Sequence, residues 1–292
     1  MAIEAESTVG ASAPDAGVFP FARWTPRLEE LAARYRAAAP FPSIGLPDFL
    51  DAPTALALAR EFPRPDDPAW IQYKHYNENK QGTSDRARFP PLIGRAIDAF
   101  NAPEFVAWVS ALTGIPGLEA DPALAGGGMH QTESQGYLHV HADFTHHPYR
   151  HELRRRVNLI LYVNEGWDPA WGGAIELWNR SMAGCEARFP PLLNHAVVFS
   201  TTEHSYHGYP DPIACPPTVT RNSLALYYYT REDAARTPVR STRYQARPGD
   251  RALPIWIDNV LLATYSRVKR TLGLRDDFAG KVLGWFDRKK RR

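Results

Sequence analysis

Apolar residues recur at helical spacing in four segments of the first 115 residues. Each segment places them at i, i+3, i+4 and i+7, which defines one face of a helix. The four sets are Leu28/Leu31/Ala32/Tyr35, Ala55/Leu58/Ala59/Phe62, Ile93/Ala96/Ile97/Phe100 and Phe105/Trp108/Val109/Leu112. The first follows a helix-start signal, Thr25-Pro26, and the last is followed by Gly114, which is typical of a helix end. The pattern predicts amphipathic helices that cover another surface.

From about residue 128 the pattern changes to short runs rich in β-branched and aromatic residues, separated by Gly, Pro, Asn and Asp. The predicted strands are 128–133, 137–143, 156–163, 173–178, 185–189, 195–200, 205–209 and 221–230. About eight strands preceded by helices favour an α+β fold, a double-stranded β-helix or jelly roll buttressed by N-terminal helices. A C-terminal helical extension follows, with an apolar stretch around 255–268.

This pattern divides the chain into three parts. Residues 1–22 are small, polar and proline-containing and are predicted to be a flexible segment. Residues 23–235 form the main domain, with helices over 23–115 and the jelly roll over 41–50 and 128–230. Residues 236–292 form a helical, basic extension. Within the main domain, the polar segment 73–85 lies between predicted helices and is expected to be a lid.

Composition narrows the class of protein. The chain has 292 residues, 44% hydrophobic and 23% charged, with a net charge of +2, which gives no nucleic-acid signature. Two cysteines provide no disulfide framework, no apolar run reaches the roughly 20 residues of a membrane span, and the start lacks a signal-peptide pattern. We therefore expect a cytoplasmic protein with no nucleic-acid partner and no transmembrane segment. The sequence does not indicate an oligomeric state.

Two predicted strands carry residues typical of a metal site. His141 and Asp143 alternate along one strand, so their side chains share a face. His207 lies in a second short strand, bounded by Gly208 and Pro210. Two histidines and one carboxylate are the ligand set of non-haem Fe(II) oxygenases, which keep positions open for other ligands. We predict that these three residues bind iron.

Other histidines are alternative metal ligands, and zinc is an alternative metal. His139 has the same strand parity as His141, so alternation alone does not exclude it. His204, and the group His146, His147 and His151, are interpreted as residues of solvated loops. Zinc prefers cysteine and histidine in closed tetrahedral sites, and neither cysteine is near the histidine–aspartate pair in sequence, so iron fits better.

A second group of residues suits a co-substrate that carries a carboxylate. A buried anion needs a charged partner, and Arg221 presents a permanently charged fork. Ser223 shares the strand face of Arg221 and is a candidate hydroxyl donor. On the strand 156–163, Tyr162 and Asn158 share one face, and each is either a further ligand of the co-substrate or an ordinary packed strand residue.

The chain resembles the Fe(II)/2-oxoglutarate-dependent oxygenase superfamily, in its prolyl-4-hydroxylase-like branch, from about residue 42 to 230. The resemblance lies in an entry strand at 41–50 and in the block Leu-Tyr-Val-Asn-Glu-Gly-Trp (161–167) followed by Trp-Gly-Gly-Ala-Ile-Glu-Leu-Trp (171–178). It also includes Asn-His-Ala-Val-Val-Phe-Ser (194–200), Tyr-His-Gly (206–208) and Arg-Asn-Ser-Leu (221–224). The segment 208–220 is longer than in many prolyl hydroxylases and holds four prolines, so it shapes a different substrate entrance.

The resemblance implies a ligand set and a reaction. It assigns Fe(2+) to His141, Asp143 and His207, and the distal carboxylate of 2-oxoglutarate to Arg221, with a supporting hydrogen bond from Tyr162. The implied enzyme is a dioxygenase that uses O2, decarboxylates 2-oxoglutarate to succinate and CO2, and hydroxylates an unactivated C–H bond, with ascorbate as a candidate reductant. Its substrate class stays open between a peptidyl or free prolyl or amino-acid residue, a small metabolite and a glycan. The alternative is a non-catalytic jelly-roll module that binds metal and 2-oxoglutarate.

The C-terminal stretch from Arg267 to Arg292 is strongly basic. It holds ten Lys/Arg against three Asp/Glu and carries Trp285 and Phe286. Such a segment suits contact with an acidic membrane surface or partner, or a helix packed on the domain with a solvated basic tail. We favour the packed helix.

Overall fold

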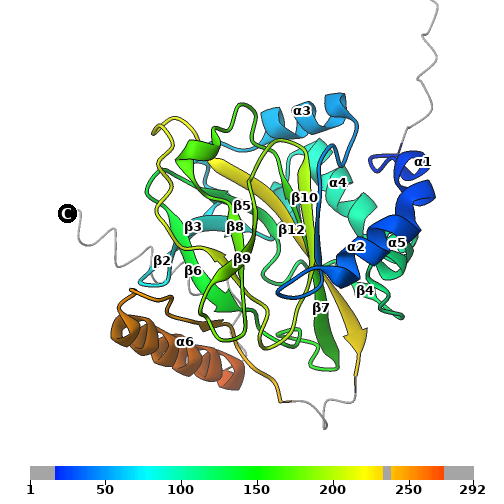
Figure 1. The fold of residues 1–292 in the computed structure, drawn as a ribbon. Coiled ribbons are helices and arrows are strands. Elements are labelled where there is room, and N and C mark those ends of the chain that lie inside the picture. Colours follow the sequence, from blue (N-terminus) through cyan, green and yellow to red (C-terminus); the bar gives the residue numbers. More distant parts are fainter. Residues whose placement is uncertain (1–16, 233–237, 273–292) are drawn as a thin grey trace, which may run out of the picture.

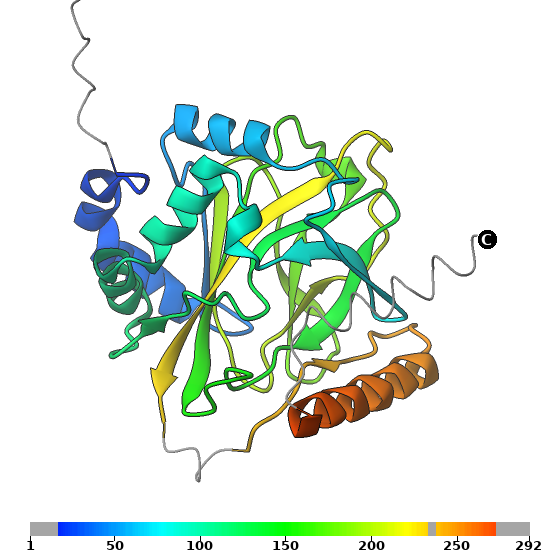
Figure 2. The ribbon, with the colours of Figure 1, turned by 180° about the vertical axis from the view of Figure 1, so that it is seen from behind.

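The strands of a computed structural model of the chain form one antiparallel sheet that curves into a nearly closed barrel, with helices on two sides (Figures 1 and 2). The structure describes residues 17–232 and 238–272, with the backbone alone for 265–272. The helices are α1 (Phe21–Trp24), α2 (Leu28–Ala37), α3 (Ala52–Glu61), α4 (Pro91–Asn101), α5 (Pro103–Thr113) and α6 (Ala252–Leu272), with short 3-10 turns at Thr25–Arg27, Arg86–Arg88 and Pro169–Trp171.

The barrel is a jelly roll with added edge strands. Its strands are β1 (Ser43–Leu46), β2 (Ile71–His75), β3 (Glu78–Thr83), β4 (Glu119–Ala120), β5 (Gly128–Thr132), β6 (Tyr137–Ala142), β7 (Leu153–Tyr162), β8 (Ile175–Trp178), β9 (Cys185–Phe189), β10 (His195–Ser200), β11 (Tyr206–Tyr209), β12 (Arg221–Arg231) and β13 (Arg243–Tyr244). They are ordered β1-β10-β7-β12-β5-β3-β6-β11-β8-β9, while β13 pairs with β6, β2 with β3 and β4 with β12. The predicted fold class is confirmed.

Strand alternation separates the core from the interior of the barrel. On β7, Val157, Leu159 and Leu161 are fully buried in the main hydrophobic core, which they share with the N-terminal helices. Asn158 and Tyr162 are at even positions, alternate with these residues and therefore face the other way, into the barrel. Fully burying one such aliphatic side chain stabilises the fold by roughly 1.5–3 kcal/mol. The apolar face thus fixes the register that points the polar face at the site.

The N-terminal helices cover this apolar face, as their spacing predicted. Helices α3, α4 and α5 each begin with proline in the first turn, and α5 ends at Gly114, whose φ of 72° is left-handed. Tyr35 of α2 and Tyr228 of β12 are buried in the layer between helices and sheet. Their hydroxyls are paired: Tyr35 Oη lies 2.7 Å from Ser200 Oγ, and Tyr228 Oη donates to the Phe100 carbonyl at 2.9 Å. The layer is therefore apolar without orphaned phenols.

The C-terminal extension lies on the opposite side of the barrel from α2 and α5 (Figures 1 and 2). Strand β13 pairs with β6, with Tyr244 opposite His141. Helix α6 is held by its inner face: the Asp258 carboxylate accepts from Asn77 Nδ2 at 2.6 Å, and Asn259 bonds the Tyr244 backbone twice, at 2.9 Å each. The helix predicted around residues 255–268 is present as α6. The packed helix favoured for the stretch 267–292, with Trp285 and Phe286, lies outside the described residues from residue 273 onward.

Two expectations need correction. The segment 73–85 is not a lid: β2 and β3 form a hairpin there, and β3 is an interior strand between β5 and β6. Of the segment 1–22 the structure describes 17–22, where Phe19 is 3% exposed within the core and α1 has already begun, so a flexible segment does not extend to residue 22. Among the described helices, none has a stretch long and apolar enough to cross a membrane.

Candidate active site

The three predicted metal ligands come together on two paired strands. His141 on β6 and His207 on β11 are directly opposite each other, and Asp143 follows the end of β6. His141 Nε2 lies 3.6 Å from Asp143 Oδ1, and His207 Nε2 lies 3.4 Å from Asp143 Oδ2. One ligand atom from each residue falls within 4.8 Å of the others. The cluster is buried inside the barrel, with both histidines less than a tenth exposed.

Backbone carbonyls orient both imidazoles. His141 Nδ1 donates to the His139 carbonyl at 2.9 Å, and His207 Nδ1 donates to the Ser205 carbonyl at 2.8 Å. A proton held on Nδ1 leaves the Nε2 lone pair free to bind a metal. Burial lowers the pKa of His207 to about 4, so its ring is neutral at physiological pH. The local backbone thus presets the tautomer that a metal requires.

Two side chains of β7 hold the Asp143 carboxylate. Asn158 Nδ2 donates to Oδ2 at 2.8 Å, and Arg155 Nη2 lies 2.9 Å from the same oxygen. Arg155 also donates to Asn158 Oδ1 at 2.8 Å and lies over the Tyr227 ring, 3.3 Å from its centroid. Burial favours the protonated acid, but Arg155 and the two histidines outweigh it and hold the pKa of Asp143 well below its usual range. The carboxylate is therefore charged and fixed in place.

Asn158 was expected either to contact the co-substrate or to be an ordinary packed strand residue, and in the structure its amide donates a hydrogen bond to Asp143. The sequence did not indicate the contact of Arg155, because this residue lies in a run of three arginines and charge runs are usually solvated. A bulge between Arg155 and Val157 interrupts the alternation of β7, so Arg155 faces the site together with Asn158 and is 2% exposed, while Arg154 and Arg156 pair with Glu232 outside. The predicted strand, 156–163, began after Arg155, so strand alternation gave no signal for this residue.

A β-bulge separates His139 from His141. Between the pairs His207–His141 and Tyr209–Leu138, one residue of β11 lies opposite two residues of β6. The extra residue breaks the alternation that made His139 a rival ligand. His139 Nδ1 instead lies 3.2 Å from Asn77 Oδ1. Gly208 makes room for the bulge, since a Cβ there would lie 2.7 Å from the Leu138 carbonyl oxygen.

Arg221 opens β12 in a buried cage beside the cluster. It is 4% exposed, and its Nε donates to the Gly173 carbonyl at 2.7 Å while Nη2 donates to Tyr162 Oη at 3.0 Å. Its guanidinium carbon lies 4.0 Å from the centroid of the Tyr209 ring. Gly173 has a φ of 73°, and a Cβ there would lie 3.2 Å from Arg221 Cδ, so the loop needs glycine to approach so closely.

The charge of Arg221 is uncompensated within the protein. Among the described residues, no carboxylate lies within ion-pair distance of this guanidinium, although it is buried. A buried cation without a counter-charge is costly, so the cage fits an anionic ligand. Ser223, also buried, lies one strand over from Tyr162 and has the same strand parity as Arg221. Tyr209 forms another side of the cage with its ring, and its hydroxyl is held by Thr132 Oγ1 at 2.9 Å. The sequence analysis did not identify this residue.

A second polar wall comes from β3 and β5. Lys80 Nζ lies 3.3 Å from Glu78 Oε2, and both side chains are largely buried. Burial would raise the pKa of Glu78, but Lys80 and His75 lower it to about 2, so the pair is ionised. His130 lies opposite Gly82 on the neighbouring strand, and neither of its buried ring nitrogens has a partner. The polar sequence of β3 concealed this wall, because it lacks the apolar alternation of a strand.

The remaining histidines are not part of the cluster. His146 and His147 are each 2% exposed, so their interpretation as solvated loop residues is wrong. His147 accepts hydrogen bonds from the backbone of Tyr149 and Arg150 and faces Asp121 at 3.3 Å, which explains its burial.

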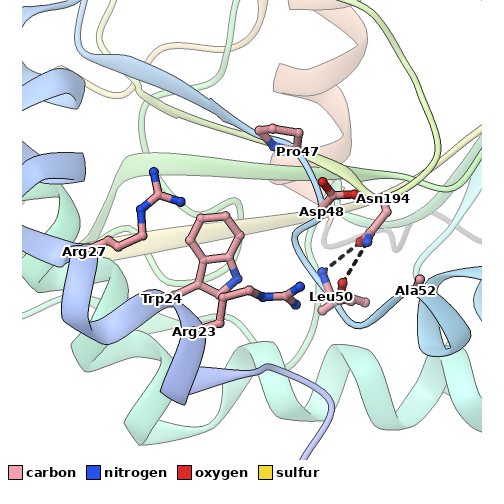
Figure 3. A pocket seen from close by; sticks show the side chains of 8 residues that line it. All are labelled: Arg23, Trp24, Arg27, Pro47, Asp48, Leu50, Ala52 and Asn194. Atoms are coloured by element: carbon pink, nitrogen blue, oxygen red, sulfur yellow. Dashed lines mark hydrogen bonds between the residues drawn. The ribbon is translucent and has the colours of Figure 1, made fainter.

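A pocket of about 440 Å³ lies between α1 and the start of α3 (Figure 3). It is lined by Trp24 between two arginines and by Asn194, which bonds both backbone groups of Leu50 at 2.8 Å. None of its residues belongs to the histidine–aspartate cluster.

The donor set fits iron. Two imidazoles and one ionised carboxylate converge on one point, which is the ligand set that leaves coordination positions open. The neighbouring cage supplies a buried cation for an acid that would reach the metal from the other side. No cysteine takes part, which disfavours a structural zinc site.

Comparison with known proteins agrees with this geometry. The sequence model of the 2OG-Fe(II) oxygenase superfamily matches residues 127–229, the span that holds the cluster and Arg221. No curated protein sequence matches the chain. Residues 127–229 therefore carry the sequence pattern of a 2OG-Fe(II) oxygenase domain.

Solved structures of prolyl hydroxylases share the fold. A prolyl 4-hydroxylase of Phytophthora capsici matches with a TM-score of 0.51 at 16% identity, over 89% of this chain and 79% of that chain. A Trichoplax adhaerens prolyl hydroxylase, solved with a hypoxia-inducible-factor peptide, matches with 0.50 at 12% identity, over 70% and 91%. A Pseudomonas putida prolyl-4-hydroxylase matches with 0.45 at 20% identity, over 69% and 99%.

Family and site together define an enzyme. The protein is an Fe(II)- and 2-oxoglutarate-dependent dioxygenase with a prolyl-hydroxylase-like fold. The expected reaction class, metal and co-substrate are confirmed, and O2 follows from the family. The roles of the individual residues and the substrate are the subject of the proposal below.

Proposed function

We propose that His141, Asp143 and His207 hold Fe(II), and that Arg221 binds the distal carboxylate of 2-oxoglutarate. The observation that carries the proposal is the uncompensated guanidinium of Arg221, buried beside a preset metal site. When bound, Fe(II), 2-oxoglutarate and O2 supply the oxidising chemistry that yields succinate and CO2 and hydroxylates a C–H bond of the substrate.

The protein's own residues contribute binding and orientation. Tyr162 and Tyr209 enclose the guanidinium, so the distal carboxylate meets a fixed fork rather than a mobile side chain. Asn158 and Arg155 act as positioning residues, because they touch the Asp143 carboxylate and hold its plane. Ser223 lies where a hydroxyl would supplement the fork.

The substrate entrance is proposed to be polar. Lys80, Glu78 and His130 lie next to the Arg221 cage, where His130 of β5 pairs with Ser223 of β12, and an ion pair with an unpartnered imidazole suits a substrate with hydrogen-bonding groups. A peptidyl or free amino-acid residue, including proline, or a small polar metabolite or glycan unit meets this requirement. The structural neighbours named as prolyl hydroxylases support the peptidyl or amino-acid class.

A substrate panel tests the proposal. Purified protein with Fe(II), 2-oxoglutarate and ascorbate is incubated with proline-containing peptides, free amino acids, polar metabolites and glycans. A substrate raises succinate formation above the substrate-free rate and gains one oxygen atom by mass spectrometry. Tight binding of 2-oxoglutarate without succinate formation under any condition would support the non-catalytic module instead.

A further inference from the structure

The outer face of α6 is apolar, although it faces away from the barrel. The exposed large hydrophobic side chains on this helix are Leu253 at 67%, Trp256 at 62%, Ile257 at 45%, Val260 at 44% and Leu261 at 63%. Their spacing of i, i+3, i+4, i+7 and i+8 places all five on one helical face. Exposed apolar side chains are common singly, but a contiguous stripe of this kind marks an interaction site.

The inner face of the same helix is already satisfied. Ile255 is 2% exposed against the domain, Asp258 is bonded to Asn77 and His75, and Asn259 is bonded to Tyr244. Asp258 is the single charged residue of the segment 252–264, and it points inward. The helix is thus inverted relative to an ordinary surface helix, with its polar groups toward the protein and its apolar groups outward. Rotation to bury the stripe would break these bonds.

The sequence around this stripe is basic. Arg243 and Arg251, both exposed, precede it. The segment Arg267–Arg292, which enters here as sequence alone, adds ten Lys/Arg against three Asp/Glu. An apolar helical face flanked by cationic residues is the arrangement of helices that lie in the interface of an anionic membrane.

We propose that the outer face of α6 binds the surface of an anionic phospholipid bilayer. Trp256 and its neighbours insert at the level of the headgroups, and the positive charge of the sequence on either side of this face attracts it to anionic lipid. A second copy of the chain is a poorer partner, because it would bring ten further cationic residues against those of the first. The proposal goes beyond the oxygenase activity and does not depend on it.

Vesicle co-sedimentation of the full chain tests the proposal. We expect binding to vesicles of phosphatidylcholine that contain phosphatidylglycerol, weaker binding to phosphatidylcholine alone, and loss of binding in high salt. The double variant W256E/L261E should weaken binding by at least about tenfold, because it places two like charges at an anionic surface. The control is Val239→Glu, which adds one negative charge at an exposed apolar residue outside α6.

A truncation separates the contribution of the basic sequence after α6 from that of its apolar face. Removal of residues 273–292 deletes seven Lys/Arg and three Asp and should reduce the preference for anionic vesicles by at least about tenfold. Unchanged uncoupled succinate formation in each variant shows that the protein is folded.

Two results would overturn the proposal. One is a wild-type protein that stays in the supernatant with both vesicle types. The other is a dimer in sedimentation velocity that W256E/L261E converts to monomer, which would assign the face to self-association.

Discussion

Arg155 and Asp143 form a buried ion pair in which Nη2 lies 2.9 Å from Oδ2. The same carboxylate oxygen lies 3.4 Å from His207 Nε2 and accepts the hydrogen bond of Asn158. One arginine therefore fixes the charge and the orientation of the carboxylate that we propose as a metal ligand.

Replacement of Arg155 should weaken iron binding more than protein stability. In Arg155→Met we expect the apparent Fe(II) affinity to fall by about 10–100-fold, because partners of a metal ligand contribute at this level. Arg155→Lys should retain part of the affinity, since it keeps the charge but not the fork. The measurement is anaerobic Fe(II) titration in the presence of 2-oxoglutarate, followed by the charge-transfer absorption of the complex. Arg154→Met, on the outer face of the same strand, is the control, and equal affinities in Arg155→Met and this control would refute the positioning role.

Replacement of Arg221 should affect the co-substrate alone. An unpaired buried carboxylate costs on the order of 3–5 kcal/mol. At ~1.4 kcal/mol per decade, Arg221→Ala should lose roughly two to three orders of magnitude in 2-oxoglutarate affinity, with Fe(II) binding intact. Arg221→Lys should lose less. Titration of 2-oxoglutarate against the anaerobic Fe(II) protein measures both variants, and an unchanged affinity in Arg221→Ala would place the carboxylate elsewhere.

Gly208 should tolerate no side chain. A Cβ at this position would lie 2.7 Å from one backbone oxygen and 2.9 Å from another, both in the bulge of β6. Gly208→Ala forces the two strands apart and should cost about 1–3 kcal/mol in unfolding free energy, together with iron affinity, because His207 is the preceding residue. Chemical denaturation and Fe(II) titration test this, with Gly17→Ala, in open space, as the control. A variant with wild-type stability and iron affinity would argue against the tight bulge.

The anchoring of α6 should depend on pH. Burial lowers the pKa of His75, but Glu78 and Asp258, at 2.8 and 2.7 Å, outweigh it, and the net pKa is raised above 6.5. A raised folded-state pKa contributes stability that is complete below pH 6.5 and is lost as the pH rises through the folded pKa. Wild type should therefore exceed His75→Gln in Tm at pH 6, and the difference should shrink above neutrality. A pH-independent difference would show that His75 is uncharged in the folded protein.

Much of the site follows from the sequence, because ligands on regular strands obey alternation. His141, Asp143 and Arg221 lie as predicted since β6 and β12 are anchored by apolar residues on their other face. His139 could not be excluded, since a bulge is set by the pairing of β6 with β11 and leaves no local pattern.

Strands that line a polar interior are also hard to predict from the sequence. Strand β3 reads as a loop, because one of its faces lines a charged cavity rather than a core, and so Lys80 and Glu78 were missed. Asn158 faces the barrel interior as expected from alternation, but its contacts with Asp143 and Arg155 were not predicted. Arg155 lies in a run of arginines, and a bulge in β7 turns it inward.

We propose that the cluster of His141, Asp143 and His207 turns over 2-oxoglutarate with iron. The most direct test of this proposal is succinate formation by purified protein with Fe(II), ascorbate, O2 and 2-oxoglutarate, compared with His141→Ala and His207→Ala. We predict slow substrate-free succinate formation by the wild type that requires Fe(II) and is abolished in both variants while their fold is retained. Succinate formation that persists in either variant, or that is absent from an iron-loaded wild type, would contradict the account.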